Sequence, residues 1–340
     1  MENEIIEILI TVPFREELIS SLRGISPRLA ITHLPVNKAD EIPLETWKKT
    51  QVLYTARVLP DPAWVPNLSW VQCHFAGVDH LKDHELIKKE NLKLTSMSGA
   101  ASTQSAEYAL TMLLALARNL PELSRLQSKS EWATERWERY NPVELRESTV
   151  GLVGYGSINR QVARLLQPFG ATVLAAKFNV RKPADEGYTP EGQGDPHGDY
   201  FSRLYPFQAL QSMLKLCDFV VVAVPETSKT NHLIGAAEIQ AMKPSAYLIN
   251  LGRGNAVDQA ALTEALVQHR IAGAALDVFQ TEPLPPDDPL WKLPNVIITP
   301  HLAGISSKYA DRAMELFKIN LDRYLATEPL FNVYDPKKGY

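Results

Sequence analysis

The feature that most constrains the fold is the stretch TVGLVGYGSINRQVARLL at residues 149–166. Residues 150–153 form a short apolar run typical of a buried strand, residues 154–156 form a glycine turn, and apolar residues then recur at helical spacing. A strand, a glycine turn and a helix in this order open a dinucleotide-binding βαβ unit. The glycines let the backbone approach a pyrophosphate, and the first N–H groups of the helix point at that anion.

The glycine pattern is incomplete, because a full G-x-G-x-x-G motif has glycine at position 159, where this chain has Asn159. The third glycine serves the close packing of helix on strand and does not contact phosphate, so its loss weakens the motif without removing its function. An ordinary turn between a strand and a helix is the alternative. The motif alone leaves both interpretations open.

The length of 340 residues predicts two domains, and 45% hydrophobic with 22% charged residues is typical of a globular protein. A net charge of −4 without a basic block argues against nucleic acid as a partner. The acidic, interrupted start at residues 1–12 does not resemble a signal peptide, and no apolar stretch reaches the roughly 18 residues of a membrane span. We therefore expect no nucleic-acid partner and no membrane partner.

Cys73 and Cys217 are the only cysteines, and they lie far apart in apolar surroundings. Two such residues provide neither a disulfide framework nor a metal cluster, and they fit a reducing compartment. We therefore expect a cytoplasmic protein without a metal site.

The first hundred residues contain short apolar runs separated by helical or loop-like segments. This alternation predicts a small parallel α/β domain. The expected strands are 4–12, 28–34, 52–56 and 70–74, with a helix at 16–22.

A long helix is predicted at residues 101–119, apolar on nearly every side and with Glu107 buried in the pattern. We expect Pro121 to end this helix and the charged residues 128–146 to form a surface connection. Trp132 and Trp137 in that connection serve packing or a subunit contact.

After the glycine turn, strands and helices alternate, and the strands are near-continuous apolar runs such as FVVVAV at 219–224. This pattern is typical of a parallel sheet covered by helices on both faces. Residues 183–205, rich in Gly, Pro and Asp, predict a long loop of a kind that is often functional or mobile. The other expected strands are 171–176, 247–251, 274–278 and 296–299, and the expected helices are 207–216, 236–242, 259–269 and 308–325.

Three polar residues, Arg253, Glu282 and His301, each follow the end of a predicted strand. Ligands of such sheets bind beyond the carboxyl ends of the strands, so these side chains are expected in one site. Arginine grips a carboxylate with two hydrogen bonds, histidine exchanges a proton near neutral pH, and a carboxylate on the far imidazole nitrogen fixes its tautomer. Taken singly, each residue is better explained as structural; downstream of a dinucleotide turn, the set favours catalysis.

Several segments together resemble the D-2-hydroxyacid dehydrogenase family over nearly the whole chain. They are VGLVGYGSINRQVA, VVVAVPETSKTNHLI, MKPSAYLINLGRGNAVDQAALTEAL, IAGAALDVFQTEPLP, LPNVIITPHLAG and, nearer the N-terminus, HFAGVDHL and GAASTQSAEYALTMLLALAR. The family's catalytic Arg, Glu and His fall on Arg253, Glu282 and His301.

The resemblance implies an α/β fold of two Rossmann-like parallel-sheet domains with the active site in the cleft between them. It implies a discontinuous substrate-binding (catalytic) domain at residues 1–101 and 303–340, and an NAD(P)-binding domain at residues 102–302. It also suggests a homodimer built on the cofactor domains.

The implied reaction is hydride transfer from reduced nicotinamide to the carbonyl carbon of a 2-oxo acid. His301 would protonate the alkoxide, with Glu282 keeping His301 oriented and charged, and Arg253 would bind the substrate carboxylate and polarise its carbonyl. The backbone N–H groups of Ala76 and Gly77 would hold the same carboxylate. The implied cofactor contacts are Ser102, Gly154, Tyr155, Gly156, Ser157, Ile158, Val224, Pro225, Thr230, Gly304 and Asp277, the last bonding the nicotinamide carboxamide.

One position departs from family members that use NAD, which carry an acidic residue at the end of the second strand. Here that position is Lys177, followed by Asn179, Arg181 and Lys182. A carboxylate repels a 2′-phosphate and cations attract it, so these residues predict NADP(H) in preference to NAD(H). The alternative is that they are solvated surface cations.

The resemblance, together with the cationic residues after the second strand, implies an NADP(H)-linked reductase of glyoxylate, hydroxypyruvate or a related 2-oxo acid. A different class of protein, a dinucleotide-sensing corepressor of the same fold, is the alternative. Turnover of 2-oxo acids distinguishes the two.

Overall fold

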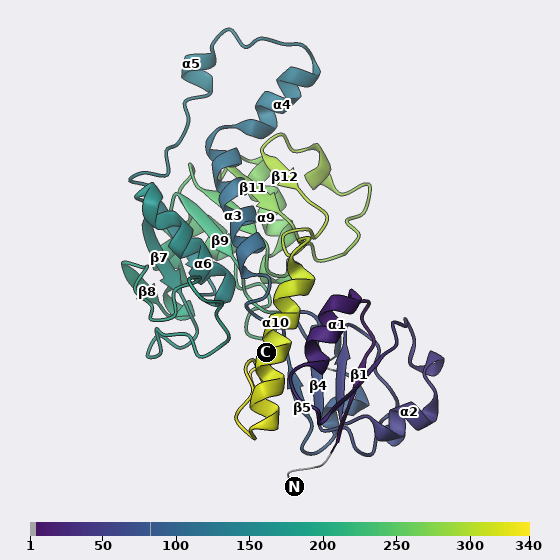
Figure 1. Ribbon diagram of the computed structural model, residues 1–340. Coiled ribbons are helices and arrows are strands. Elements are labelled where there is room, and N and C mark those ends of the chain that lie inside the picture. Colours follow the sequence, from purple (N-terminus) through teal and green to yellow (C-terminus); the bar gives the residue numbers. More distant parts are fainter. Residues whose placement is uncertain (1–4, 82) are drawn as a thin grey trace. The chain divides into compact units, whose positions relative to one another are not determined.

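The alternating apolar runs form two separate parallel sheets in the computed structural model, which describes residues 5–81 and 83–340 (Figure 1). Unit 1 comprises residues 1–101 and 306–340, and unit 2 comprises residues 102–305. Each unit is an α/β unit built on one parallel sheet, so the predicted fold class is confirmed.

The sheet of unit 1 has five parallel strands in the order β2-β1-β3-β4-β5. Its central strands are buried on both faces, which explains their continuous apolar runs. Helix α10 packs on this sheet, with the rings of Phe317 and Tyr324 centred 5.5 and 5.3 Å from that of Trp70. The elements are β1 Ile6–Ile10, α1 Glu16–Arg23, β2 Leu29–His33, α2 Leu44–Lys49, β3 Val52–Thr55, β4 Trp70–Cys73, β5 Lys93–Thr95 and α10 Tyr309–Leu325.

The sheet of unit 2 has seven parallel strands in the order β12-β11-β10-β9-β6-β7-β8. The strand order reverses between β6 and β9, and in such sheets this reversal marks the ligand site. The strands are β6 Thr149–Val153, β7 Thr172–Ala176, β8 Arg203–Tyr205, β9 Phe219–Val222, β10 Tyr247–Asn250, β11 Gly273–Leu276 and β12 Val296–Ile298. The helices are α3 Ser102–Ala117, α4 Leu120–Ser128, α5 Arg136–Arg139, α6 Ser157–Leu166, α7 Leu210–Leu214, α8 Ala236–Ala241 and α9 Gln259–Val267.

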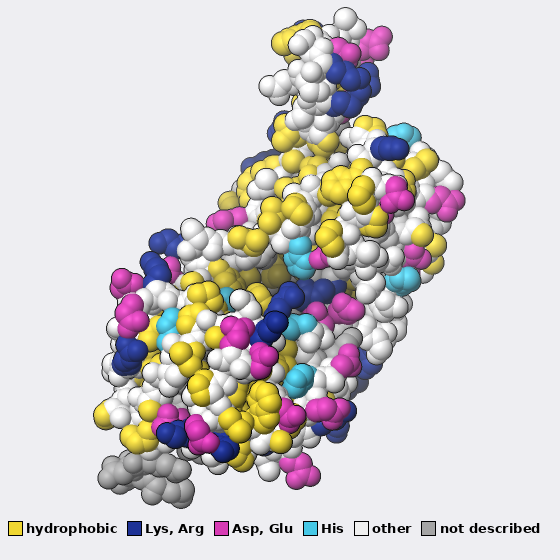
Figure 2. Space-filling model, turned by 90° about the vertical axis from the view of Figure 1, so that its right-hand side faces the viewer, with side chains coloured by type: hydrophobic (Ala, Val, Ile, Leu, Met, Phe, Trp, Pro, Cys, Tyr) yellow, Lys and Arg dark blue, Asp and Glu magenta, His cyan; other side chains and the backbone are white. Residues whose placement is uncertain are grey.

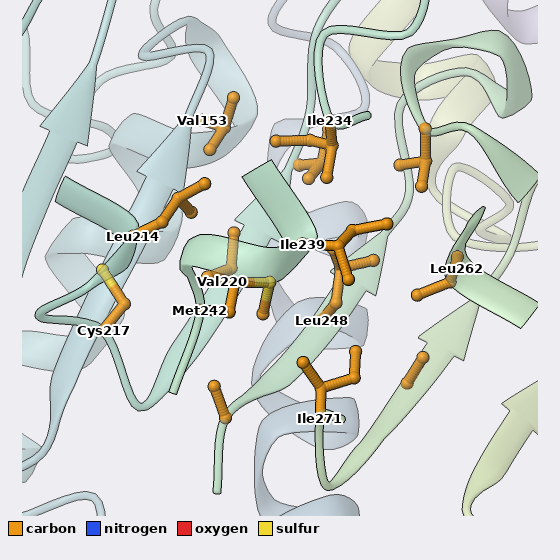
Figure 3. Packing of buried hydrophobic residues seen from close by; sticks show 14 of the residues in the cluster. Val153, Leu214, Cys217, Val220, Ile234, Ile239, Met242, Leu248, Leu262 and Ile271 are labelled. Atoms are coloured by element: carbon orange, nitrogen blue, oxygen red, sulfur yellow. The ribbon is translucent and has the colours of Figure 1, made fainter. Parts of the chain in front are cut away.

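Alternate residues of the unit 2 strands supply two hydrophobic clusters, one on each face of the sheet. In β9, Val220 packs with α7, α8 and α9, whereas Val221 packs on the other face with α3 and α6. Figure 3 shows the first cluster, where Val220 and Leu248 lie among residues from these helices such as Ile239. Each such fully buried side chain contributes about 1.5–3 kcal/mol to folding.

Three local predictions need correction. Glu107 is exposed, because α3 packs one side on the sheet and α6 and leaves another side to solvent. Arg118 and Asn119 separate α3 from α4; Asn119 is in the left-handed conformation at φ 54°, and Pro121 lies in the first turn of α4. Residues 203–205 of the predicted loop form the edge strand β8, paired in parallel with β7.

No helix in the described part of the chain has both the length and the apolar character needed to cross a membrane. On the face shown in Figure 2, acidic and basic side chains are interspersed. Helices α4 and α5 stand apart from the sheet of unit 2 (Figure 1).

Candidate active site

His301 and Glu282 form a directly bonded pair at neighbouring strand ends of unit 2. His301 follows β12 and Glu282 follows β11, and imidazole Nδ1 lies 2.8 Å from carboxylate Oε2. The other carboxylate oxygen of Glu282 accepts the backbone N–H of Phe279 at 3.0 Å. Both side chains remain partly open to solvent, with 51% and 36% of their surfaces exposed. The pair therefore fixes the orientation of an imidazole that is open to solvent.

The turn that carries His301 is shaped by Asp277, at the end of β11. The buried carboxylate of Asp277 accepts the hydroxyl of Thr299 at 2.6 Å and the N–H groups of Leu302 and Ala303 at 2.8 Å each. The backbone carbonyl of Asp277 also accepts the N–H of His301 at 2.9 Å. Sequence reasoning linked Asp277 only to the cofactor and missed this contribution, which depends on loop conformation.

Arg253 lies in the loop after β10. Strand β10 is the neighbour of β11, which leads to Glu282. Gly254 brings the two loops into close contact, because a Cβ at this position would lie 1.9 Å from the carbonyl oxygen of Phe279. Asn250 fastens the same turn by donating from Nδ2 to the carbonyl of Arg253 at 3.0 Å. The loop of Arg253 therefore adjoins the loop of Glu282.

The glycine turn after β6 has the form expected of a phosphate site. Gly154 has φ of 86° and its Cα faces Ala223 and Val224 so closely that a Cβ would lie 2.7 Å or less from both. Gly156 is the N-cap of α6, and a Cβ there would meet no atom within 4 Å. Since the first N–H groups of a helix have no intrahelical acceptor, Ser157 and Ile158 begin α6 at an open, positively polarised end. These features fit a dinucleotide pyrophosphate.

Asn159 replaces the third glycine of the motif without opening the turn. The buried Nδ2 of Asn159 donates to the carbonyls of Val153 and Gly154 at 3.0 Å each. The side chain thus fastens the helix to the end of β6, which is the role that close packing of a glycine has in the full motif.

The cationic segment 177–182 follows β7. Lys177 is half-buried and its Nζ donates to the carbonyls of Lys182 at 2.8 Å and Ala184 at 3.4 Å, and burial lowers its pKa. Asn179, Arg181 and Lys182 are exposed, and Lys182 pairs with Glu186 at 2.7 Å. Lys177 therefore holds the chain that follows it, which the sequence prediction of a phosphate contact did not anticipate.

A further cation adjoins this segment from the loop after β9. Lys229 Nζ lies 4.5 Å from the ring centre of Phe178. Sequence reasoning missed Lys229, because only the fold brings the ends of β7 and β9 to the same edge of the sheet.

The remaining predicted cofactor residues of unit 2 lie in its loops and helix ends. Val224 and Pro225 follow β9, and Thr230 donates its hydroxyl to the carbonyl of Pro225 at 2.6 Å. Ser102 begins α3 and is buried, and the carbonyl of Gly304 accepts from Gln104 at 2.9 Å. Thr230 thus holds the loop after β9.

In unit 1, Ala76 and Gly77 lie in the loop after β4. His74 at the start of this loop is held by the hydroxyl of Tyr54, 2.7 Å from its Nδ1, and its carbonyl accepts the hydroxyl of Tyr309 at 2.5 Å. Burial lowers the pKa of His74 to about 4, so the ring is neutral at physiological pH. His74 is thus a support of the loop.

A parallel sheet with a glycine turn at its switch point, and a His–Glu pair beside an arginine loop at its carboxyl edge, defines a dinucleotide-dependent oxidoreductase. Comparison with known proteins agrees. A sequence model of the family "D-isomer specific 2-hydroxyacid dehydrogenase, NAD binding domain" matches residues 110–303. The chain is 33% identical over 319 residues to a glyoxylate reductase from Thermofilum pendens, covering 93% of this chain and 83% of that protein.

Solved structures are similar over almost the full length. A D-isomer specific 2-hydroxyacid dehydrogenase from Xanthobacter autotrophicus in complex with NADPH and MES has a TM-score of 0.79 and 28% identity, covering 99% of this chain and 100% of that one. An NADPH-dependent glyoxylate/hydroxypyruvate reductase from Sinorhizobium meliloti in complex with NADP and malonate has a TM-score of 0.70 and 27% identity, covering 97% of each chain.

The chain therefore belongs to the D-isomer-specific 2-hydroxyacid dehydrogenase family and is an NAD(P)-dependent oxidoreductase. The family that the sequence motifs predict is confirmed.

Proposed function

We propose that this protein reduces a small 2-oxo acid, such as glyoxylate or hydroxypyruvate, to the 2-hydroxy acid with NADPH. The observation that carries the proposal is the 2.8 Å contact between His301 Nδ1 and Glu282 Oε2 at the carboxyl edge of the unit 2 sheet. Relatives named glyoxylate reductase support the choice of substrate.

In this proposal reduced nicotinamide supplies the hydride, and the protein supplies the proton and the grip on the substrate. Because Glu282 occupies Nδ1 of His301, the proton passes from Nε2 to the developing alkoxide oxygen. Arg253 binds the substrate carboxylate through paired hydrogen bonds and polarises the adjacent carbonyl. We further propose that the backbone N–H groups of Ala76 and Gly77 hold that carboxylate, and that Asp277 bonds the nicotinamide carboxamide.

We propose NADP(H) in preference to NAD(H). The supporting observation is that Arg181 and Lys182 are exposed beside β7 and that Lys229 adjoins the same segment. Lys177 supports this preference indirectly, because its Nζ donates to the carbonyls of Lys182 and Ala184 and so holds the segment in place. Hydrogen bonds to charged groups contribute about 1.5–3 kcal/mol each, so one 2′-phosphate contact shifts the preference by roughly tenfold to a hundredfold.

We also propose a homodimer that forms through the segment containing α4 and α5. Trp132 and Trp137 are 83% and 76% exposed there, and large exposed apolar side chains mark interaction surfaces. For its compartment we propose the reducing cytoplasm, since Cys73 and Cys217 are both buried free thiols.

The test is to mix the purified chain with NADPH or NADH and glyoxylate, hydroxypyruvate or pyruvate, and to follow the loss of nicotinamide absorbance. We expect turnover of at least one acid, with a higher kcat/KM for NADPH. His301→Asn should lose nearly all turnover and still bind NADPH. A wild-type protein that binds the cofactor and turns over no 2-oxo acid would refute the proposal and favour a corepressor.

A further inference from the structure

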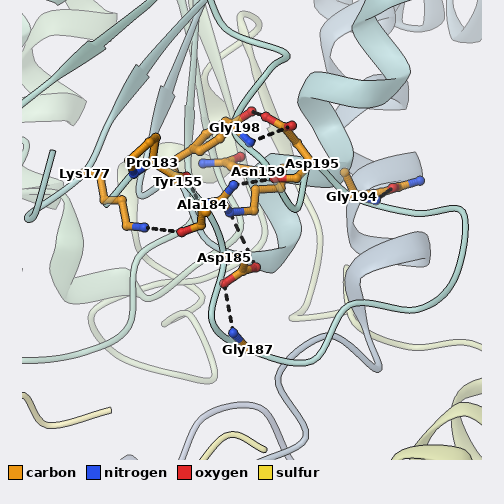
Figure 4. Close-up of polar contacts among 12 residues, drawn as sticks. Tyr155, Asn159, Lys177, Pro183, Ala184, Asp185, Gly187, Gly194, Asp195 and Gly198 are labelled. Atoms are coloured by element: carbon orange, nitrogen blue, oxygen red, sulfur yellow. Dashed lines mark hydrogen bonds and ion pairs between the residues drawn. The ribbon is translucent and has the colours of Figure 1, made fainter. Parts of the chain in front are cut away.

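The long connection between β7 and β8 is irregular, yet Tyr188, Gly194 and Asp195 within it are buried, and the connection is hydrogen-bonded to α6 and to the glycine turn (Figure 4). Asp195 is only 1% exposed, and the N–H of Gly194 donates to the side chain of Gln161 at 2.5 Å. A loop that merely crosses the surface would not place a carboxylate inside the protein.

Asp195 organises the loop around its carboxylate. It accepts the N–H groups of Gly198 at 3.0 Å, Asp199 at 2.8 Å and Tyr200 at 3.1 Å, and the hydroxyl of Tyr155 at 2.6 Å. Burial alone would raise its pKa, but these hydrogen bonds and the nearby Arg160 hold the pKa of Asp195 below its usual value. Because Tyr155 is the middle residue of the glycine turn, the loop is bonded to that turn.

Arg160, in α6, ties a second part of the loop to the first. Its side chain is 1% exposed, its guanidinium donates to the carbonyls of Asp195 and Pro183, and it lies 4.7 Å from the ring centre of Tyr155. Its Nε is 3.5 Å from a carboxylate oxygen of Asp185. The buried guanidinium of Arg160 thus contacts Tyr155 of the glycine turn, Asp195, and residues 183–185 at the beginning of the loop.

The beginning of the loop is also the end of the cationic segment 177–182. Lys177 bonds the carbonyls of Lys182 and Ala184, and Arg160 bonds the carbonyl of Pro183 between them. The segment therefore continues directly from β7 at one end. At the other end its backbone is held by the side chains of Lys177 and Arg160. A buried charge network adds little net stability compared with apolar packing, and what it can add is a unique geometry.

We propose that the buried network of Tyr155, Arg160 and Asp195 determines cofactor specificity by position: it links the pyrophosphate turn to the 2′-phosphate segment 177–182 and fixes that segment for NADP(H). This inference rests on the proposed preference for NADP(H). The three residues are positioning residues, because they act through the backbone of the turn and the segment. NADH has no 2′-phosphate, so its binding depends less on the segment.

The experiment measures the Kd of the full chain for NADPH and for NADH by nicotinamide fluorescence. Arg160→Met removes the buried donors and keeps the length of the side chain. Its Kd for NADPH should rise about tenfold, as expected for loss of one well-placed charged contact, and its Kd for NADH should rise less than about threefold. Tyr155→Phe removes only the hydroxyl. It should raise the ratio of the Kd for NADPH to the Kd for NADH in the same direction as Arg160→Met, by a smaller factor.

Arg164→Met is the matched control, because Arg164 lies one turn further along α6 and contacts Tyr200 near the far end of the loop. This variant should keep the wild-type ratio of the two Kd values. Equal changes for NADPH and NADH in Arg160→Met and in Tyr155→Phe would overturn the inference, and so would no change in either. If Arg160→Met does not fold, Tyr155→Phe decides by the same criterion.

The proposed preference for NADP(H) is tested separately, by the Kd values of the wild-type chain. A wild-type chain that binds NADH as tightly as NADPH would refute that proposal before any variant is made. A wild-type chain that prefers NADPH, with variants that lose both cofactors in proportion, would refute only the positioning role.

Discussion

Replacing Gly254 by alanine tests whether the loops of Arg253 and Glu282 must stay in contact. The added Cβ would lie 1.9 Å from the carbonyl oxygen of Phe279 and 2.5 Å from the N atom of Gln280. Real Cβ atoms stay at least 3.0 Å from such atoms, so the two backbones must separate by 1.1 Å, the difference between 3.0 and 1.9 Å. Both sides of the contact are backbone, so no flexible side chain can yield.

That displacement reaches the His301–Glu282 pair directly. The N–H of Phe279 donates to Glu282 at 3.0 Å, and Glu282 holds His301 at 2.8 Å. A misplacement of about 1 Å can lower a rate about a hundredfold. Overpacking of this kind also destabilises a protein by about 1–3 kcal/mol.

The assay combines steady-state reduction of a 2-oxo acid with NADPH titration and thermal unfolding. For Gly254→Ala we expect kcat to fall about a hundredfold while NADPH still binds, with a melting temperature lowered by several degrees. Gly235→Ala is the control, because its Cβ would lie 3.4 Å or more from its neighbours. A Gly254→Ala enzyme with more than half the wild-type kcat/KM would show that this close approach does not position the catalytic pair.

Four further predictions concern individual side chains. Glu282→Gln should lower kcat by about 10²- to 10⁴-fold without weakening NADPH binding, and near-normal kcat would contradict a role in orienting the imidazole. Asn159→Ala, which removes the hydrogen bonds from Nδ2 to the carbonyls of Val153, Gly154 and Val221, should lower the unfolding free energy by about 1–3 kcal/mol in denaturant titration; an unchanged value would show that the amide is not needed there. Because burial lowers the pKa of His74 to about 4 from 6.5, the unfolded chain binds an extra proton between these values, so stability is lost as pH falls through this window. His74→Gln should flatten the pH dependence of the unfolding free energy between these pKa values, to which His74 contributes about 3 kcal/mol in the wild type. An equally steep pH profile in the variant would exclude His74 as its source. Changing Trp132 and Trp137 to serine should convert the proposed dimer to monomers in size-exclusion chromatography with light scattering, and a dimer that persists would place the interface elsewhere.

The long buried elements could be predicted from sequence because their patterns extend over many residues. The apolar run at 219–224 became β9, and the helix expected at 259–269 became α9. The strands β5 and β8 were missed because Lys93–Thr95 and Arg203–Tyr205 each contain a single aliphatic residue, whereas the equally short β12, Val296–Ile298, is a continuous apolar run. Pro121 suggested a helix end, but proline is equally at home in the first turn of a helix, where it lies in α4.

Candidate catalytic residues could be selected because strand ends meet at one edge of a parallel sheet. His301 and Glu282 follow neighbouring strands of this edge, and their side chains are hydrogen-bonded. The order of the strands does not predict the contacts that side chains make within loops. The use of Lys177 as a backbone clamp and the burial of Arg160 under the loop depend on how residues 183–202 fold over α6, and their composition carries no periodic signal.

The central claim is that one imidazole, oriented by a carboxylate, delivers the proton in a hydride transfer to a 2-oxo acid. Single-turnover kinetics with pre-bound NADPH measure that step without contributions from binding or product release. We expect His301→Asn to slow this step by at least about a hundredfold, with an unchanged Kd for NADPH. A variant that transfers hydride within about threefold of the wild-type rate would contradict the account.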